Sequence, residues 1–161
     1  MKRIIISLLF ALCGSWVAAQ AGSDLGGDVQ WERRSRFFKT YMHKTFPEFK
    51  LQDGEYLFVI PSGCRGCNEH VLNYLADHPD VIAGKYQAVL FSADTKRLIP
   101  ASAFSKVQNV LCDNTNKLDR MDFGIDGVAI LKIQNKRIVA YKCFAVNDMK
   151  GDVKDFFISI P

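Results

Sequence analysis

Two cysteines three positions apart carry the most specific chemistry in the chain: Cys64 and Cys67, in the stretch "VIPSGCRGC". An apolar run ends at Pro61, and an amphipathic helical pattern begins with the pair. A thiolate at a helix N-terminus is stabilised by unpaired backbone N–H groups and by the helix dipole. Cys67, one turn further along, can attack a mixed disulfide formed by Cys64. The spacing therefore predicts a dithiol/disulfide couple that exchanges two electrons.

The residues around the pair suit that chemistry. Ser62 or Gly63 is the expected helix cap. Arg65 places a positive charge beside the sulfur, which favours the thiolate, and Gly66 leaves room for a partner chain. These four residues form the expected environment of the site.

Other uses of the pair are less well supported. A c-type haem site needs a histidine directly after the second cysteine, and that position is Asn68. A structural zinc site needs four ligands, whereas Cys64, Cys67 and His70 supply at most three. His70 and His78 are expected to be a surface residue and a helix-end residue. A purely structural disulfide closing so small a loop adds little stability. Zinc binding and a structural disulfide stay open as alternatives to redox activity.

The first residues have the pattern of a secretory signal peptide. Two basic residues precede a run at 4–12 that is apolar except for Ser7, and small residues follow. A membrane-spanning helix needs about 20 apolar residues, so the run is too short to span and is expected to be removed. Cleavage after Ala19 or Ala21 fits the preference for small residues, and residues 1–21 are assigned to the signal.

A second interpretation of this segment makes Cys13 a lipid-carrying cysteine, because it follows the apolar run and precedes Gly14 and Ser15. Leu12, however, stands where lipoprotein signals have a small residue. Export into a periplasm or cell envelope without a lipid is favoured, and a lipid anchor at Cys13 is the alternative.

Cys112 and Cys143 each lie in an apolar segment with strand character. An unbonded cysteine in such a segment is usually a small buried hydrophobe. A disulfide between the two would require adjacent strands with close Cα atoms, and this remains an alternative.

The charge balance points to no polyanionic partner. The formal net charge is +4, and it falls to +2 when the two basic residues of the signal are removed. Nucleic acid is therefore not an expected partner. The densest basic cluster, residues 31–44, alternates with apolar residues as a solvated amphipathic helix does; a helix for a membrane surface or a partner protein is the alternative.

The periodicity predicts one α/β domain of 51–161 behind an extension of 22–50 with one amphipathic helix. The expected elements are a helix at 31–46, a strand within 52–60, a helix at 64–78, a strand at 86–93, a helical link at 100–108, a strand at 109–113, a short helix at 116–127, a hairpin of 128–133 and 137–144, and a helix at 147–160. Strands joined through helices imply a parallel portion, to which the hairpin adds an antiparallel edge.

Several side chains are expected to point inward from these helices. They are Trp31, Phe37, Phe38, Tyr41, Met42 and Phe46 from the first helix, Cys67, Val71, Tyr74, Leu75 and His78 from the second, and Val153, Phe156, Phe157 and Ile160 from the last. The last helix is expected to be capped by Asn147 or Asp148.

With these features in place, the chain resembles the thioredoxin-like superfamily, and specifically its exported TlpA-like branch, which serves disulfide reduction and cytochrome maturation in bacterial envelopes. The likeness runs from residue 55 to the C-terminus and is carried by "YLFVIPSGCRGC", by "NVLCDNTNKLDRMDFGIDGV", and by the hairpin and last helix. It implies a central sheet flanked by helices, with Cys64 as attacking and Cys67 as resolving thiol. It also implies that Cys112 and Cys143 lie toward opposite edges and do not bond.

The chain departs from this family at the residues that surround the pair. The family's cis-proline is replaced by Ala129, so the Val128–Ala129 bond is expected to be trans, because a non-proline cis bond costs about 2.5–4 kcal/mol. The family's tryptophan before the first cysteine is Gly63. The substrate-binding turn is thus expected to be altered.

Proton transfer and peroxidase chemistry are affected by two further departures. The buried acid that thioredoxins carry on the preceding strand is replaced by Phe58, which leaves Glu69 and His70 as the acids or bases closest to Cys67 in sequence. Peroxidases of the superfamily place a threonine where this chain has Pro61, so peroxidase activity is not expected.

These observations predict an exported, thioredoxin-like thiol-disulfide oxidoreductase without metal or other cofactor, whose Cys64/Cys67 pair exchanges disulfides with envelope proteins. A degenerate thioredoxin-fold binding module and a small metal-binding protein are the alternatives. Arg65 and the helix terminus favour an oxidising couple, whereas the resemblance favours a reducing one, so the direction stays open.

Overall fold

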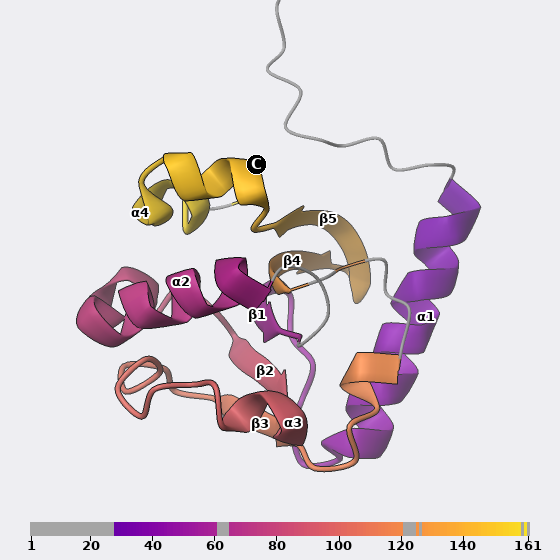
Figure 1. Cartoon of the computed structure of the whole chain (residues 1–161). Coiled ribbons are helices and arrows are strands. Elements are labelled where there is room, and N and C mark those ends of the chain that lie inside the picture. The colour runs from indigo at the N-terminus through magenta and orange to yellow at the C-terminus, as the bar shows by residue number, and fades with distance from the viewer. Residues whose placement is uncertain (1–27, 61–64, 121–124, 126, 159, 161) are drawn as a thin grey trace, which may run out of the picture.

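The computed structural model describes residues 28–60, 65–120, 125, 127–158 and 160 (Figure 1). The helices are α1 (Asp28–Thr45), α2 (Arg65–Asp77), α3 (Ala93–Lys96) and α4 (Val153–Phe156), with 3₁₀ turns η1 (Pro79–Ile82), η2 (Leu118–Arg120) and η3 (Val146–Lys150). The strands are β1 (Gly54–Val59), β2 (Ala88–Ser92), β3 (Val110–Asp113), β4 (Val128–Gln134) and β5 (Arg137–Cys143). No helix among these residues is both long and apolar enough to cross a membrane.

The strands form one mixed sheet in the order β3-β2-β1-β4-β5. β1 and β3 run parallel to β2, while β4 runs antiparallel to both β1 and β5. The predicted α/β class, with a parallel portion and an antiparallel hairpin at one edge, is confirmed.

The central strand β1 supplies apolar side chains to both faces of the sheet. Leu57 and Val59 enter one core, and Tyr56 and Phe58 enter the other, each with no exposed surface. Successive residues of a strand point to opposite faces, so an uninterrupted apolar run requires cover on both sides.

Helix α2 covers one face with Val71, Leu72 and Leu75, all fully buried. The predicted inward residues of the last helix, Val153, Phe156, Phe157 and Ile160, join the same core, as expected. Figure 1 shows α2 and α4 on one side of the sheet and α1 on the other.

Helix α1 covers the other face and is part of the core. Trp31, Phe38, Tyr41 and Met42 are buried there. The ring of Phe38 meets the rings of Tyr56 and Phe58 edge to face, with centroids 6.0 and 5.8 Å apart.

Ser35 ties α1 to the sheet by hydrogen bonds. Its Oγ donates to the carbonyl of Trp31 at 2.7 Å and accepts from the N–H of Ile138 in β5 at 2.9 Å. The helix that the sequence places outside the α/β domain therefore satisfies a buried backbone group of the sheet.

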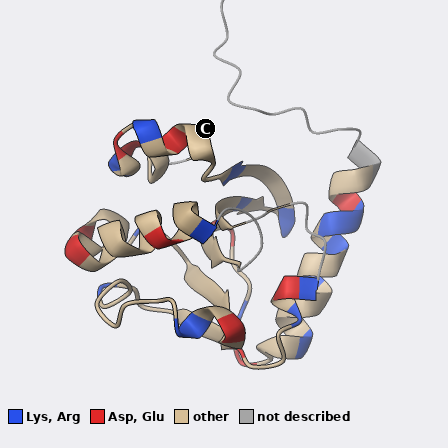
Figure 2. Cartoon of the chain, in the orientation of Figure 1, with Lys and Arg blue, Asp and Glu red and all other residues tan. Residues whose placement is uncertain are grey.

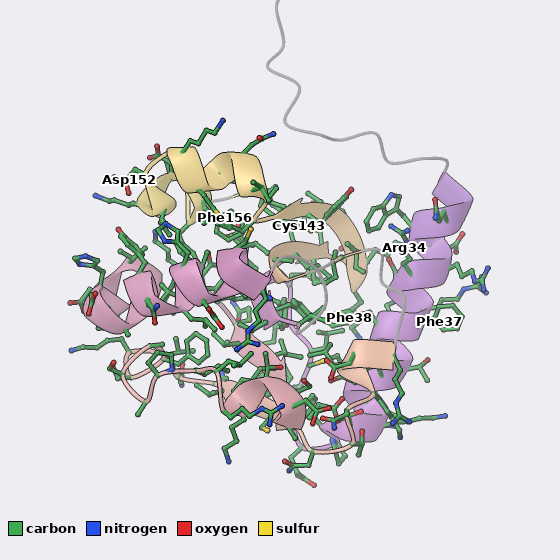
Figure 3. All side chains as sticks on the ribbon, in the orientation of Figure 1. Arg34, Phe37, Phe38, Cys143, Asp152 and Phe156 are labelled. Carbon is green, nitrogen blue, oxygen red and sulfur yellow. The ribbon has the colours of Figure 1, made fainter. Side chains whose placement is uncertain are left out.

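Two side chains expected to point inward do not. Phe37 is 44% exposed, and Figure 3 shows it pointing away from the sheet while Phe38 points toward it. The buried stripe of α1 follows spacings of three and four through Trp31, Ser35 and Phe38, and position 37 falls outside that stripe. His78 is exposed because it follows the end of α2.

The segment between β2 and β3 differs from the prediction. Residues 101–106 form turns instead of a helix, and the helical turn occurs earlier, as α3 directly after β2. Ser92 caps α3 by accepting a hydrogen bond from the N–H of Thr95. Of the short helix expected at 116–127, η2 is present, while residues 121–124 and 126 lie outside the described residues.

The last predicted helix is two short pieces, η3 and α4, because Gly151 between them is extended. The caps also differ from the prediction. The Asp148 carboxylate accepts from the N–H of Ala145 at 2.6 Å, and the Asp152 carboxylate caps α4 by accepting from Lys154 N–H at 2.8 Å.

Lysine amines attach the C-terminal segment to the rest of the fold. Three side-chain amines donate to backbone carbonyls of residues 155–160 over 3.0 to 3.2 Å: Lys85, Lys132 and Lys142. Hydrogen bonds from a charged donor are stronger than neutral ones. The segment is thus held by cations as well as by its apolar side chains.

The predicted β4–β5 hairpin is present, but its turn has two residues and not the expected three of 134–136, because Gln134 belongs to β4. Asn135 and Lys136 both have positive φ, 51° and 58°, as a type I′ turn requires. The carboxylate of Asp53 accepts from both backbone N–H groups, at 2.8 and 3.1 Å, and these bonds lower the pKa of Asp53.

Asp113 is the last residue of the edge strand β3, and its side chain fixes the backbone that follows. Its side chain is fully buried and accepts four hydrogen bonds: from Thr115 N–H and Oγ, from Leu118 N–H, and from the phenol of Tyr41 at 3.1 Å. Burial alone would raise the pKa of Asp113, but these donors outweigh it and the net pKa is lowered. Burial, together with the Asp113 charge, raises the pKa of Tyr41, which keeps the phenol a proton donor.

Replacing Asp113 with Asn is expected to lower the free energy of unfolding by about 3 kcal/mol, because buried donors lose a charged acceptor. Tyr41→Phe, which removes one of the four donors, is expected to cost about 1 kcal/mol. Both are measured by urea unfolding at neutral pH.

The effect of Asp113→Asn on the free energy of unfolding should also depend on pH. The folded-state pKa of Asp113 lies below its unfolded value, so its contribution is complete above roughly pH 4 and is lost as pH falls through the folded pKa. The difference in free energy of unfolding between wild type and Asp113→Asn should therefore become smaller in acid. A difference that stays constant down to about pH 2 would contradict a role for the carboxylate charge.

Candidate disulfide site

Cys67 lies in the first turn of α2, which begins at the carboxyl end of the central strand β1. It is 1% exposed and is disulfide-bonded. Cys112 and Cys143 are not in a disulfide, so the partner of Cys67 lies outside the described residues. Ser62, Gly63 and Cys64, which the sequence assigns to the site, also lie outside them.

Hydrogen bonds hold the end of β1 just before the cysteine segment. The carbonyl of Val59 accepts from Thr95 Oγ at 3.3 Å, and the carbonyl of Ile60 accepts from the amide of Asn68 at 3.1 Å. The N–H of Ile60 donates to the carbonyl of Gly127 at 2.9 Å. The last backbone groups of the strand are thereby fixed from three directions.

Asn68 is the residue of this site that sequence reasoning missed. It is 2% exposed, one position after Cys67, and it connects α2 to the end of β1. Its carbonyl side also meets Gly127, where an added Cβ would approach Asn68 Oδ1 to 2.6 Å. Gly127 has a φ of +64°, which glycine adopts without strain.

The predicted substrate-turn residues lie on opposite faces of β4. Val128 packs in the same core as Cys67, whereas Ala129 packs in the core that α1 covers. The Val128–Ala129 peptide bond is trans, as expected. Val128, and not Ala129, is therefore the member of this pair on the face where Cys67 lies.

Phe58, which the sequence resemblance assigns to the position of a buried acid, also lies on the α1 face, opposite to Cys67. The hydroxyl of Thr95 donates to the carbonyl of Val59 at the end of β1 and lies 2.7 Å from Ser92 Oγ. Both Thr95 and Ser92 are fully buried, and Thr95 is the one that bonds the backbone of the strand end.

Met149 reaches Cys67 from η3. Its Sδ lies 3.6 Å from Cys67 Sγ, although the two residues are 82 positions apart in the chain. Met149 is 40% exposed while Cys67 is 1% exposed, so the contact joins the buried sulfur to a side chain that reaches the surface. Polarisable thioethers make favourable contacts with sulfur and aromatic neighbours.

Arg65 forms an ion pair with the carboxylate of Glu69. Its Nε bonds Glu69 Oε1 at 2.8 Å, and the Arg65 side chain is 78% exposed. An exposed ion pair has a weak field because water screens it. Arg65 is therefore expected to stabilise a nearby thiolate less than its charge alone suggests. The backbone N–H groups in the first turn of α2 then supply the larger part of that stabilisation.

The surface beside Cys67 is open at Gly66. A Cβ added there would meet nothing within 4 Å, so a partner backbone can approach closely, as the sequence predicts. His70 is exposed on the next turn, with its ring 6.4 Å from that of Phe144.

Cys112 and Cys143 lie on β3 and β5, the two edge strands, so the expectation that they do not bond each other is confirmed. Burial raises the pKa of the Cys112 thiol, and its Sγ donates to Asn114 Oδ1 at 3.4 Å. A raised pKa disfavours the thiolate, which is the nucleophilic form of the Cys112 thiol.

Other surface features lie away from the cysteine. A hollow of about 610 Å³ at the amino end of β1 is lined by Asp53, Glu55, Lys85 and Lys132, among others, and Cys67 is not part of it. Among the described residues, no group of three or more His, Cys, Asp or Glu side chains could hold a metal ion.

Comparisons of the chain with protein-family models, with curated proteins and with solved structures found no match.

The contact between Asn68 and Gly127 can be measured as a coupling free energy. Gly127→Ala should cost about 1–2 kcal/mol for the left-handed backbone, and more for the clash with Asn68. In an Asn68→Ala background the clash is absent, so the substitution should cost less. Urea unfolding of the four proteins of the cycle gives the coupling.

Gly84 provides the matched control for this cycle. Its φ is +67° and an added Cβ meets nothing within 4 Å, so Gly84→Ala carries the backbone cost without the clash. Its cost should be the same with or without Asn68→Ala. If the Gly127 substitution shows no more dependence on Asn68 than this control, the two residues do not constrain each other.

Met149→Ala is expected to speed the alkylation of reduced Cys67 several-fold, because it removes a side chain that contacts the buried sulfur and reaches the surface. The rate at Cys67 is followed by peptide mass spectrometry after reduction. Val146→Ala, at a residue of η3 that is 59% exposed, is the control and should leave the rate unchanged. Equal rates in wild type and Met149→Ala would show that Met149 does not shield the cysteine.

Proposed function

We propose that this protein is an exported thioredoxin-like thiol-disulfide oxidoreductase, which exchanges disulfides with envelope proteins through Cys64 and Cys67. The observation that carries the proposal is the disulfide-bonded Cys67 in the first turn of α2, directly beyond the central parallel strand. Cys64, three positions earlier, is its proposed bonding partner.

In the reducing direction, the Cys64 thiolate attacks one sulfur of a partner's disulfide. A mixed disulfide forms, and the partner's other sulfur leaves as a thiolate, which takes up a proton. The Cys67 thiolate then attacks Cys64, closes the internal disulfide and releases the partner's second thiol. Two electrons pass from the cysteine pair to the partner, and the same steps in reverse oxidise a partner dithiol.

The burial of Cys67 supports this division of roles. A sulfur that is 1% exposed and in contact with Met149 is poorly accessible to a large partner, but it can reach a neighbouring sulfur three positions away. The open space over Gly66 favours a protein substrate, whose backbone can lie against the helix start. Cys64 is therefore the proposed attacking thiol and Cys67 the resolving one.

The fold is compatible with the thioredoxin-like assignment. The cysteine segment joins the central strand β1 to α2, and α2 leads to the parallel strand β2. The β4–β5 hairpin and α4 follow in the proposed order. The resemblance assigns Ala129 to the position of the family's cis-proline; the Val128–Ala129 bond is trans and follows the left-handed Gly127.

Export is the proposed location, on the basis of the apolar run at residues 4–12 and the small residues after it. An envelope compartment of this kind is oxidising enough for the disulfide of Cys67 to persist.

The redox potential of the pair tests the proposal and gives the direction. The protein is titrated with glutathione or dithiothreitol, and its thiols are trapped at each point. We expect a reversible two-electron transition, near about −270 mV for a reductant or about −120 mV for an oxidant. Cys64→Ser should abolish the transition, and Cys112→Ser, on the edge strand β3, should leave it unchanged.

Other outcomes would replace the proposal. A pair that is never reduced under native conditions indicates a structural disulfide. Unchanged binding to an envelope partner after both Cys64→Ser and Cys67→Ser indicates the binding module, an alternative favoured by the altered turn at Ala129. Stoichiometric zinc or copper that is lost on alkylation indicates a metal-binding protein.

A further inference from the structure

The outward face of α1 concentrates the positive charge of the protein. With Trp31, Ser35, Phe38 and Met42 turned to the sheet, the opposite side of the helix is left to exposed residues. Those exposed side chains are Glu32, Arg33, Arg36, Phe37, Thr40, His43 and Lys44. Figure 2 shows the basic residues along α1. We call Arg33, Arg36, Phe37 and Lys44 the α1 outer face.

The charge of the remaining chain is balanced. Residues 28–45 hold five basic and two acidic residues, a net charge of +3, whereas residues 46–161 hold fourteen of each. The net charge of the expected mature chain is therefore a property of this one helix. A local concentration of cations attracts anionic surfaces far more than the same charge dispersed.

The acid on the outer side of α1 does little to offset these cations. Glu32 lies 4.0 Å from Arg137, so its charge is already partnered by a cation from β5. This ion pair offsets the one acidic side chain among the described exposed residues of α1 with a cation from outside the helix. The α1 outer face thus presents cations that the rest of the fold does not neutralise.

Phe37 distinguishes this face from an ordinary solvated surface. Its ring is 44% exposed, and the guanidinium of Arg33 lies 5.4 Å from the ring centroid. An exposed aromatic ring among long cationic side chains is typical of helices that lie in the headgroup region of a bilayer, where the ring enters the apolar boundary and the cations meet phosphates.

We propose that the α1 outer face docks on an anionic phospholipid surface. Charge complementarity selects the occupant: the cations of this face match anionic headgroups, and the exposed ring of Phe37 matches their apolar boundary. This inference does not depend on the activity of the cysteine pair.

Docking through α1 sets the orientation of the molecule. Helix α1 and Cys67 belong to cores on opposite faces of the sheet. With α1 against the bilayer, α2 and the disulfide face away from it, where a partner protein has access. The sheet acts as a spacer between the lipid surface and the site.

Vesicle binding tests this inference. The protein, purified after its native processing, is mixed with vesicles of phosphatidylcholine alone or with phosphatidylglycerol added, and the bound fraction is measured by co-sedimentation. We expect binding to the anionic vesicles only, with loss at high salt. Each cation near the surface contributes about fivefold to partitioning, so Arg33→Glu, Arg36→Glu and Lys44→Glu together should weaken it by about a hundredfold or more.

A second triple variant controls for net charge. Lys106→Glu, Lys117→Glu and Lys154→Glu change the total charge equally, at exposed residues outside α1. This variant should retain most of the binding, and Phe37→Ala should lose part of it at unchanged charge. Circular dichroism confirms that each variant is folded.

The contrary outcomes are distinct. Equal losses in the two triple variants would mean that net charge alone attracts the vesicles, and would overturn the proposal. So would the absence of binding to anionic vesicles, or equal binding to neutral ones. If vesicles are not bound but an acidic protein is captured in an Arg36-dependent manner, the α1 outer face is a protein interface instead.

Discussion

The requirement that β1 be covered on both faces governs the architecture. Residues 56–60 are buried without interruption, and their side chains alternate between two cores. One face receives α2 and the C-terminal segment, and the other receives α1. Each completely buried large side chain is worth about 1.5–3 kcal/mol, so neither cover is optional. A helix that precedes the α/β unit in sequence is for this reason an integral layer of it, joined to β5 through the hydroxyl of Ser35.

Strand β1 also positions the start of the cysteine segment. The apolar end of β1 has backbone groups at Val59 and Ile60 that Thr95, Asn68 and Gly127 satisfy from three separate segments. Ile60, the last described residue before the cysteines, is therefore held in a defined position. Cys67 is buried one turn into α2, with Met149 in contact with its sulfur. The fold thus holds one sulfur of the site inside, while the open surface at Gly66 stays accessible.

Sequence periodicity predicts the parts of this fold whose causes are local. The apolar run of β1, the stripe of α2 and the turn residues Asn135 and Lys136 act over a few positions, and these elements are where the pattern places them. The break at Gly151 and the helical turn after Ser92 depend on short-range capping that competes with weak helical patterns. The contacts of Asn68 with β1 and of Met149 with Cys67 were not predictable, because they arise from tertiary packing across 8 and 82 positions. The position of Cys67 at the helix start was predictable because strand, loop and helix are consecutive.

The lysine contacts of the C-terminal segment depend on the residue type of the donor but not on that of the acceptor. The acceptors are main-chain carbonyls, which every residue type supplies, whereas the donors are three particular amines on flexible stems, Lys85, Lys132 and Lys142. Arginine does not reproduce a compact ammonium group at such a site. Substitutions at the exposed residues of α4 therefore leave these contacts intact. Substitution of the three lysines, which lie elsewhere in the sequence, removes the contacts that position the C-terminal segment.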